Sequence, residues 1–291
     1  MKRLLRRTVF SLLAALPALG LFIGVGVTAS ASVHPAATSN SAQKAAAAKA
    51  AAVAFVKSLK VGYHAKNKPA PVRDHSQIKG LTQVTSTNWS GYADTGSGFS
   101  SVSATWKEPT PSCSGRSTAL AAFWVGIDGY TSASVEQDGT LIECYEGGTY
   151  QFSWWEIYPV NSVQVVGESV AAGDSITATV TRSGTSYKLS VTDSTHSANS
   201  FSTTQTYAAA ADSSAEWIAE APSGSTGVEP LAKFSTWTDA NSAATAGSTS
   251  GTISSFPDDE ITMITSSGAT EAQPSALNSA GNSFTVTWER S

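Results

Sequence analysis

Two glutamates lie four residues apart in the stretch AEWIAEAP, residues 215–222, of a chain in which only 14% of the residues are charged. In an extended strand, successive side chains point to opposite faces, so Glu216 and Glu220 would share one face with Ile218 between them. Such a pair is either a solvated strand face or a catalytic carboxyl group beside its neighbour. The choice depends on which other catalytic groups the chain offers.

Histidine-based catalysis has almost no candidate residue. After residue 80 only His196 occurs, in the polar and turn-like stretch TDSTHSANS, and we interpret it as an exposed loop residue. The chain therefore lacks the histidine base that a hydrolase of the Ser-His-Asp or Cys-His type needs. The same shortage of ligands argues against a metal site. No phosphate-binding or dinucleotide-binding glycine motif is present, so we expect no cofactor.

Carboxyl groups remain as the candidate catalysts. An aspartic peptidase needs two Asp-Thr/Ser-Gly loops, but only one is found, at Asp94, and a single copy is a common turn sequence. Chemistry with paired carboxyl groups then means either glycoside hydrolysis or peptide hydrolysis in acid.

Composition divides the chain into three parts. Residues 1–31 carry basic residues, an apolar run and a small-residue exit, which predicts a signal peptide cleaved after about Ala31. Residues 32–80 are alanine-rich and basic, with eight Lys/Arg against Asp74, giving +7. Residues 81–291 carry six Lys/Arg against twenty-one Asp/Glu, giving −15. We therefore expect a secreted, extracellular protein with no membrane anchor after cleavage and no nucleic-acid partner.

The charge contrast also suggests a role for the second part. We expect residues 32–80 to be an autoinhibitory pro-segment that charge pairs hold against the acidic body and acid releases. Export to an oxidising compartment favours one disulfide between Cys113 and Cys144. We expect a monomer.

The elements that must position these residues are strands. Residues 150–158 alternate regularly, residues 175–193 form a hairpin pattern around a Ser-Gly turn, and residues 283–288 alternate again. The glycines of 96–101 indicate a further hairpin turn. The pattern predicts an all-β fold, an antiparallel β-sandwich, for residues 81–291. Trp154, Glu156 and Tyr158 share one strand face, which is either core or a concave substrate groove.

Five segments occur in the order typical of one family: TNWSGYA (87–93), WVGIDG (124–129), VEQDG (135–139), SWWEIYP (153–159) and AEWIAE (215–220). From Asn88 to the C-terminus the chain resembles the glutamic peptidases, or eqolisins, of the secreted bacterial type. The resemblance implies a lectin-like jelly roll of two curved antiparallel sheets. It also implies protein or peptide substrates.

The resemblance further implies a catalytic pair. Gln137 and Glu216 match the family's glutamine and glutamate, and Trp154 with Glu156 matches the pair that lines its cleft. Glu216 would take a proton from water and Gln137 would stabilise the oxyanion, with Glu220 in support. The acidic neighbours of Gln137, Glu136 and Asp138, depart from the family pattern.

Two alternatives stay open on the residues alone. One is a jelly-roll glycoside hydrolase that uses Glu216 with Glu156 or Glu220. The other is a non-catalytic carbohydrate-binding module with Trp154, Trp155 and Tyr158 as its platform. Gln137 distinguishes them from a peptidase, because a glycosidase has no required use for an amide at that place.

Overall fold

The computed structural model describes residues 36–62, 82–115 and 117–291, with the side chains of residues 41–62, 83–115 and 117–291. The predicted signal peptide, residues 1–31, and the expected end of the pro-segment near residue 80 lie outside the described residues. The chain divides into two compact units, 1–41 and 42–291, and the contacts below belong to the second. Within the described residues, no helix combines the length and the apolar character needed to cross a bilayer.

The alanine-rich stretch forms the helix α1 (Ala36–Val56), as its residue types favour. The Ser58 hydroxyl donates to the carbonyl of Phe55 just after the helix ends, at 2.6 Å. The chain then continues as residues 59–62, of which Lys60 forms an isolated β-bridge with Ser223. This places residues 42–62, part of the predicted pro-segment, in the same compact unit as the β-structure.

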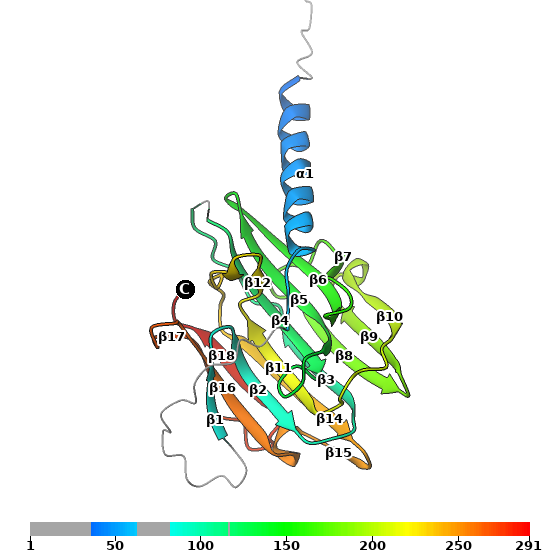
Figure 1. Ribbon diagram of the computed structural model, residues 1–291. Coiled ribbons are helices and arrows are strands. Elements are labelled where there is room, and N and C mark those ends of the chain that lie inside the picture. The colour runs from blue at the N-terminus through cyan, green and yellow to red at the C-terminus, as the bar shows by residue number, and fades with distance from the viewer. Residues whose placement is uncertain (1–35, 63–81, 116) are drawn as a thin grey trace, which may run out of the picture. The chain divides into compact units, whose positions relative to one another are not determined.

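One long sheet contains nearly all the strands and folds back on itself into two layers (Figure 1). Its path is β10-β9-β8-β3-β14-β18-β17-β16-β2-β11-β4-β5-β6-β7, with β1 beside β16 and β15 beside β14. Strands of the first part, β3, β8 and β9, pack face to face against β4, β5 and β11 of the second part. The predicted antiparallel sandwich is confirmed, although its two sheets are joined through β17 and β18.

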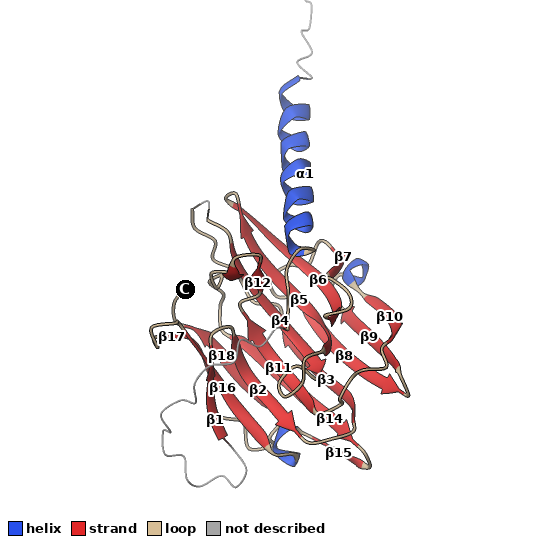
Figure 2. Ribbon diagram, in the orientation of Figure 1, coloured by secondary structure: helices blue, strands red, loops and turns tan. Residues whose placement is uncertain are grey.

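The strands of the first layer and its link are β3 (Phe99–Lys107), β8 (Ser175–Ser183), β9 (Ser186–Asp193), β10 (Phe201–Thr206), β14 (Trp237–Ala246), β15 (Thr249–Gly251), β17 (Thr270–Pro274) and β18 (Ser283–Trp288). Those of the second layer are β1 (Thr82–Ser86), β2 (Trp89–Thr95), β4 (Ala119–Ile127), β5 (Val135–Tyr145), β6 (Gly148–Tyr158), β7 (Gln164–Gly167), β11 (Ser214–Glu220) and β16 (Asp258–Ile264). The short strand β12 (Ser223–Gly224), labelled in Figure 2, pairs with β13 (Gly227–Val228). The short 3-10 helices are η1 (Ser197–Asn199) and η2 (Ile253–Ser255).

Two apolar clusters stabilise this arrangement. The first lies between the layers and includes residues of both, such as Trp217 of β11 and Val180 of β8. The second lies on the other face of the second layer, which we call the outer face, and is completed by side chains of residues 52–61. Strands β4 and β5 are therefore buried on both faces, because one face meets the first layer and side chains of residues 52–61 pack on the other.

The hairpin predicted at residues 175–193 forms as β8 and β9, in the register Ile176 opposite Asp193. The prediction of a hairpin turn at residues 96–101 is wrong. Strand β2 pairs with β11 and β16, whereas β3 pairs with β8 and β14, so this turn connects the two layers. Cys113 and Cys144 form the predicted disulfide.

Candidate active site

Four residues form one row across the outer face of the second layer. Gly126 of β4 lies opposite Glu216 of β11 on one side and opposite Gln137 of β5 on the other, and Gln137 in turn lies opposite Glu156 of β6. Residues in register across antiparallel strands point to the same face. Glu216 and Gln137 are two strands apart, which corresponds to about 10 Å between their Cα atoms.

Gly126 keeps the surface between Gln137 and Glu216 free of a side chain. A Cβ atom at this position would lie 2.9 Å from the Trp124 ring, 3.0 Å from Val135 and 3.3 Å from the Cβ of Gln137. The residue type is therefore set by the space at the centre of the row. Reacting groups on either side of Gly126 can approach one molecule bound above it.

The Gln137 amide is fully buried and points its nitrogen at two acceptors. It donates to Oε2 of Glu156 at 3.1 Å and to the backbone carbonyl of Val61 at 2.8 Å. The second acceptor belongs to the residues after α1. An amide N–H that already holds a peptide carbonyl is suited to stabilise negative charge on a carbonyl oxygen.

Glu216 is fully buried, and neither carboxyl oxygen has a hydrogen-bond partner within normal distance. Burial raises the pKa of Glu216 well above its usual value, and the carboxylates of Asp128 and Glu136 act in the same direction. The Ser214 hydroxyl and the Tyr130 backbone oppose this shift only partly. Burial therefore favours the protonated form of Glu216.

Glu220 lies on the same face but accepts several hydrogen bonds. Its donors are the Trp124 indole at 2.9 Å, the Gly62 backbone N–H at 2.8 Å and the Asn88 amide at 3.4 Å. Burial raises the pKa of Glu220 to about 8 although these donors lower it. Burial also raises the pKa of Glu156 well above its usual value, and the charge of Glu220 adds to the effect.

Trp154 and Tyr158 lie on the outer face with Glu156, in register with Gly139 and Val135 respectively. Trp154 is fully buried, and Tyr158 is partly buried. This face is therefore neither bare nor part of the core between the layers, since residues 52–61 complete it. Trp155 points the opposite way, into the cluster between the layers, so it cannot share a platform with the other two.

The acidic neighbours of Gln137 point away from it. Strand alternation sends Glu136 and Asp138 to the face between the layers. There Asp138 accepts a hydrogen bond from the backbone of Ser190 on β9, and Glu136 lies near Asp212 and Arg182. The departure from the family pattern therefore falls on the face between the layers, not on the outer face that carries Gln137.

The sequence predictions did not include Asp128, whose carboxylate holds the chain at the start of β11. It accepts bonds from the backbone N–H groups of Ala211, Asp212 and Ser213 at 2.7–2.8 Å, and from the Ser213 hydroxyl at 2.9 Å. Asp128 itself has a φ of 71°, in the left-handed region. It fixes where Glu216 enters the sheet.

Trp124, Gly126 and Asn88 were also not predicted as site residues. All three stand inside the quoted segments WVGIDG and TNWSGYA, which was the available signal. Val61 and Gly62 carried no such signal, because nothing in their residue types separates them from a linker.

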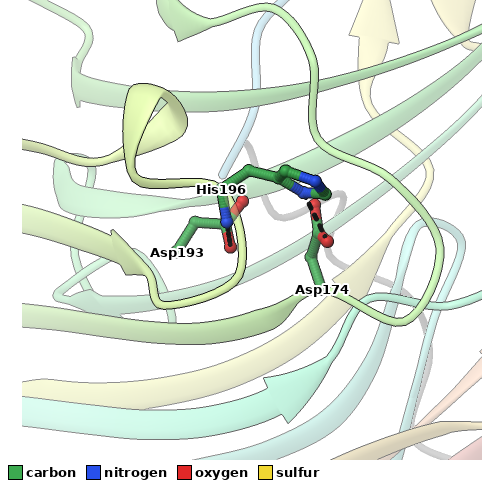
Figure 3. A group of neighbouring side chains, drawn as sticks. All are labelled: Asp174, Asp193 and His196. Atoms are coloured by element: carbon green, nitrogen blue, oxygen red, sulfur yellow. Dashed lines mark hydrogen bonds and ion pairs between the residues drawn. The ribbon is translucent and has the colours of Figure 1, made fainter.

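A second group of polar residues lies where β8 begins and β9 ends (Figure 3). Within the described part of the chain, Asp174, Asp193 and His196 are the one set whose ligand atoms could reach a shared metal ion. Their atoms already bond within the protein: His196 Nδ1 lies 2.8 Å from Asp174, and Asp193 accepts the backbone N–H groups of Thr195 and His196. The group orders a loop, and His196 is exposed, as predicted.

Comparison with known families gives one match over most of the β-structure. The Peptidase A4 family matches residues 87–288. Scytalidopepsin B of Scytalidium lignicola is 39% identical over 115 residues, which are 39% of this chain and 41% of that protein. Aspergillopepsin-2 of Aspergillus niger is 26% identical over 245 residues, covering 76% of this chain and 84% of that protein.

Two solved structures of glutamic peptidases have a similar fold. Scytalido-glutamic peptidase with a transition-state analogue inhibitor superposes with a TM-score of 0.60 at 25% identity, covering 70% of this chain and 98% of that one. Aspergilloglutamic peptidase from Aspergillus niger gives a TM-score of 0.51 at 29% identity, covering 59% and 99%.

Proposed function

Because this chain belongs to the Peptidase A4 family, we propose that it is an acid endopeptidase in which Glu216 activates water and Gln137 stabilises the oxyanion. The observation that carries this assignment is the row across the outer face, in which Gly126 separates the two side chains. Membership of a peptidase family favours peptide hydrolysis over the glycosidase and carbohydrate-binding alternatives.

The proposed reaction uses one water and no covalent intermediate. Glu216 takes a proton as the water oxygen attacks the peptide carbonyl carbon, and the amide N–H of Gln137 holds the developing oxyanion. Glu216 then returns the proton to the leaving nitrogen as the carbon–nitrogen bond breaks. Glu156 holds the Gln137 amide in place by accepting its hydrogen bond.

The protonation of Glu216 bears on when this reaction can start. A protonated carboxyl cannot take a proton from water, and burial favours the protonated form of Glu216. Exposure to water would return its pKa toward the ordinary value of about 4.3. Base catalysis is therefore favoured when water reaches Glu216.

We propose that residues 32–80 act as a pro-segment that covers the outer face. Within this part, Ala52, Val56, Leu59 and Val61 are buried on the outer face. The contacts differ in kind from the expected charge pairs. Among residues 42–62 one ion pair to the body is formed, Lys49 to Glu168 at 3.5 Å, between half-exposed side chains.

We also propose that the protein is secreted, of the bacterial type, after removal of residues 1–31, and that it acts as a monomer on protein substrates without a nucleic-acid partner. The basic apolar leader and the acidic body support these assignments. Sequencing the N-terminus of the protein recovered from culture medium tests the first. Sedimentation of the purified chain tests the second.

The catalytic assignment is tested with Glu216→Gln and Gln137→Ala. Each should lower the rate of hydrolysis of a denatured protein in acid by about a hundredfold or more, the scale for loss of a general base or an oxyanion donor. Glu143→Gln is the matched control, because Glu143 is equally buried on the outer face without a partner but lies outside the row. A folded Glu216→Gln variant with nearly full activity would overturn the assignment.

A further inference from the structure

The residues after α1 bind the candidate active site through their backbone. Lys60 pairs with Ser223, its N–H donating to the Ser223 carbonyl at 2.8 Å and its carbonyl accepting from the Ser223 N–H at 3.1 Å. This is an isolated antiparallel β-bridge, whose backbone hydrogen bonds hold a peptide without regard to its side chains.

The peptide group between Val61 and Gly62 is held on both sides. Its carbonyl accepts the Gln137 amide at 2.8 Å, and its N–H donates to Oε2 of Glu220 at 2.8 Å. The backbone of Val61 also bonds to Glu156. A peptide carbonyl thus occupies the proposed oxyanion donor, which is where the carbonyl of a substrate would have to lie.

Apolar contacts fix the same residues on the outer face. Leu59 and Val61 are buried in the cluster that contains Trp89, Trp124 and Trp154. Lys57 and Lys60 remain exposed. Residues 59–62 therefore bind through backbone hydrogen bonds and buried apolar side chains rather than through charge.

Gly62 has a conformation that other residues adopt with difficulty. Its φ is +78°, in the left-handed region. A Cβ atom there would lie 2.4 Å from Val135 Cγ1, 2.5 Å from Gln137 Nε2 and 2.8 Å from Gln137 Oε1. These distances are far inside van der Waals contact, so a side chain at this position would collide with the proposed oxyanion donor.

We propose that residues 59–62 are a built-in inhibitor whose binding mode only glycine permits, and that Gly62 keeps the bound peptide from acting as a substrate. The inference rests on the proposed function and deepens it by naming how the site is regulated. Ordinary substrates carry a side chain after the attacked carbonyl, so they must follow a different backbone path over Gln137. The bound segment fills the site along a path on which the bond after Val61 is not cleaved.

The test compares the full chain carrying Gly62→Ala with one carrying Gly173→Ala. Gly173 is the matched control because its φ is +87° but a Cβ there meets no atom within 4 Å. Leu59→Ala serves as a second variant that weakens the segment without the backbone change. Hydrogen–deuterium exchange of residues 57–62, followed by mass spectrometry in a Glu216→Gln background, reports binding of the segment without any need for catalysis.

We expect exchange at residues 57–62 to become about tenfold faster or more in Gly62→Ala and faster in Leu59→Ala, while Gly173→Ala behaves as wild type. In the catalytically competent chain, the initial rate of peptide hydrolysis should rise about tenfold in Gly62→Ala without a lag. Unchanged exchange in Gly62→Ala overturns the inference, and so does a wild-type product that begins at Gly62. Faster exchange with no hydrolysis by any variant would support the binding mode and count against the peptidase function.

Discussion

Burial of Asp94 should make the free energy of unfolding fall as the pH rises from 4 to 7. Replacing Asp94 with asparagine should make this fall smaller. Asp94 lies on β2 directly opposite Asp258 of β16, and both of its carboxyl oxygens are buried without a hydrogen-bond partner. Burial raises the pKa of Asp94 to about 9, and the charge of Asp258 adds to this effect. The pKa of Asp258 is raised to about 6, chiefly by burial.

The sign follows from the proton that the folded chain retains. In the unfolded chain Asp94 ionises near pH 4, whereas in the folded chain it stays protonated until about pH 9. Its contribution to stability is therefore complete below about pH 4 and is lost as the pH rises toward the folded pKa. The loss is about 1.4 kcal/mol per pH unit, or about 4 kcal/mol between pH 4 and pH 7 as an upper limit.

Asparagine cannot ionise, so this term disappears in Asp94→Asn. Its amide hydrogens would be buried without acceptors, which costs about 1–3 kcal/mol at every pH. We therefore expect the variant to be less stable than the wild type at pH 4 and more stable at pH 7, with the two curves crossing between.

Urea unfolding at pH 4, 5, 6 and 7 checks this, with both chains in a Glu216→Gln background to prevent self-digestion. Glu289→Gln is the control, because Glu289 is exposed near the C-terminus; its stability should follow the wild type at each pH. Parallel curves for Asp94→Asn and wild type would refute the reasoning, since the burial of Asp94 would then carry no proton linkage.

Three further outcomes follow from the structure. Gly126→Ala should lower kcat by about a hundredfold, because the added methyl group stands between Gln137 and Glu216, while the circular dichroism spectrum stays unchanged. A variant with the kcat of the wild type would count against this row of residues as the active site. Cys113→Ser should lower the free energy of unfolding, measured in urea, by about 3 kcal/mol, because the disulfide to Cys144 no longer restricts the unfolded chain. An unchanged urea midpoint would argue against this entropic contribution of the disulfide. A chelator should leave hydrolysis at its full rate, and a loss would point to metal-dependent chemistry.

Much of this protein could be predicted from local residue patterns. Alternation of apolar and polar residues identified the strands at 150–158, 175–193 and 283–288, because the period of two follows from backbone geometry alone. The same alternation placed Glu216 and Glu220 on one strand face. The near absence of histidine narrowed the chemistry to carboxyl groups, since residue types limit which proton transfers are available.

Pairing between distant strands could not be predicted in this way. The turn at 96–101 has the residues of a hairpin, yet it joins two layers, because tertiary packing decides which strands pair. The same holds for the row of Glu216, Gly126 and Gln137, whose register depends on contacts between strands far apart in sequence. The sequence could not tell whether the face of Trp154 was core or groove.

By itself the sequence determined the residue types and the strand period, which are local properties of the chain. The cysteine pair was predicted from the expected compartment, and the two candidate catalytic side chains from the resemblance to the glutamic peptidases. Only the tertiary structure decided that Gln137 and Glu216 lie on either side of Gly126, and that the peptide group of Val61 and Gly62 bonds to Gln137 and Glu220. The physical reason is that Gly62 cannot be distinguished in the sequence from a glycine in a linker. Its φ of +78° and the atoms that fill the space of a side chain are known only from the tertiary structure.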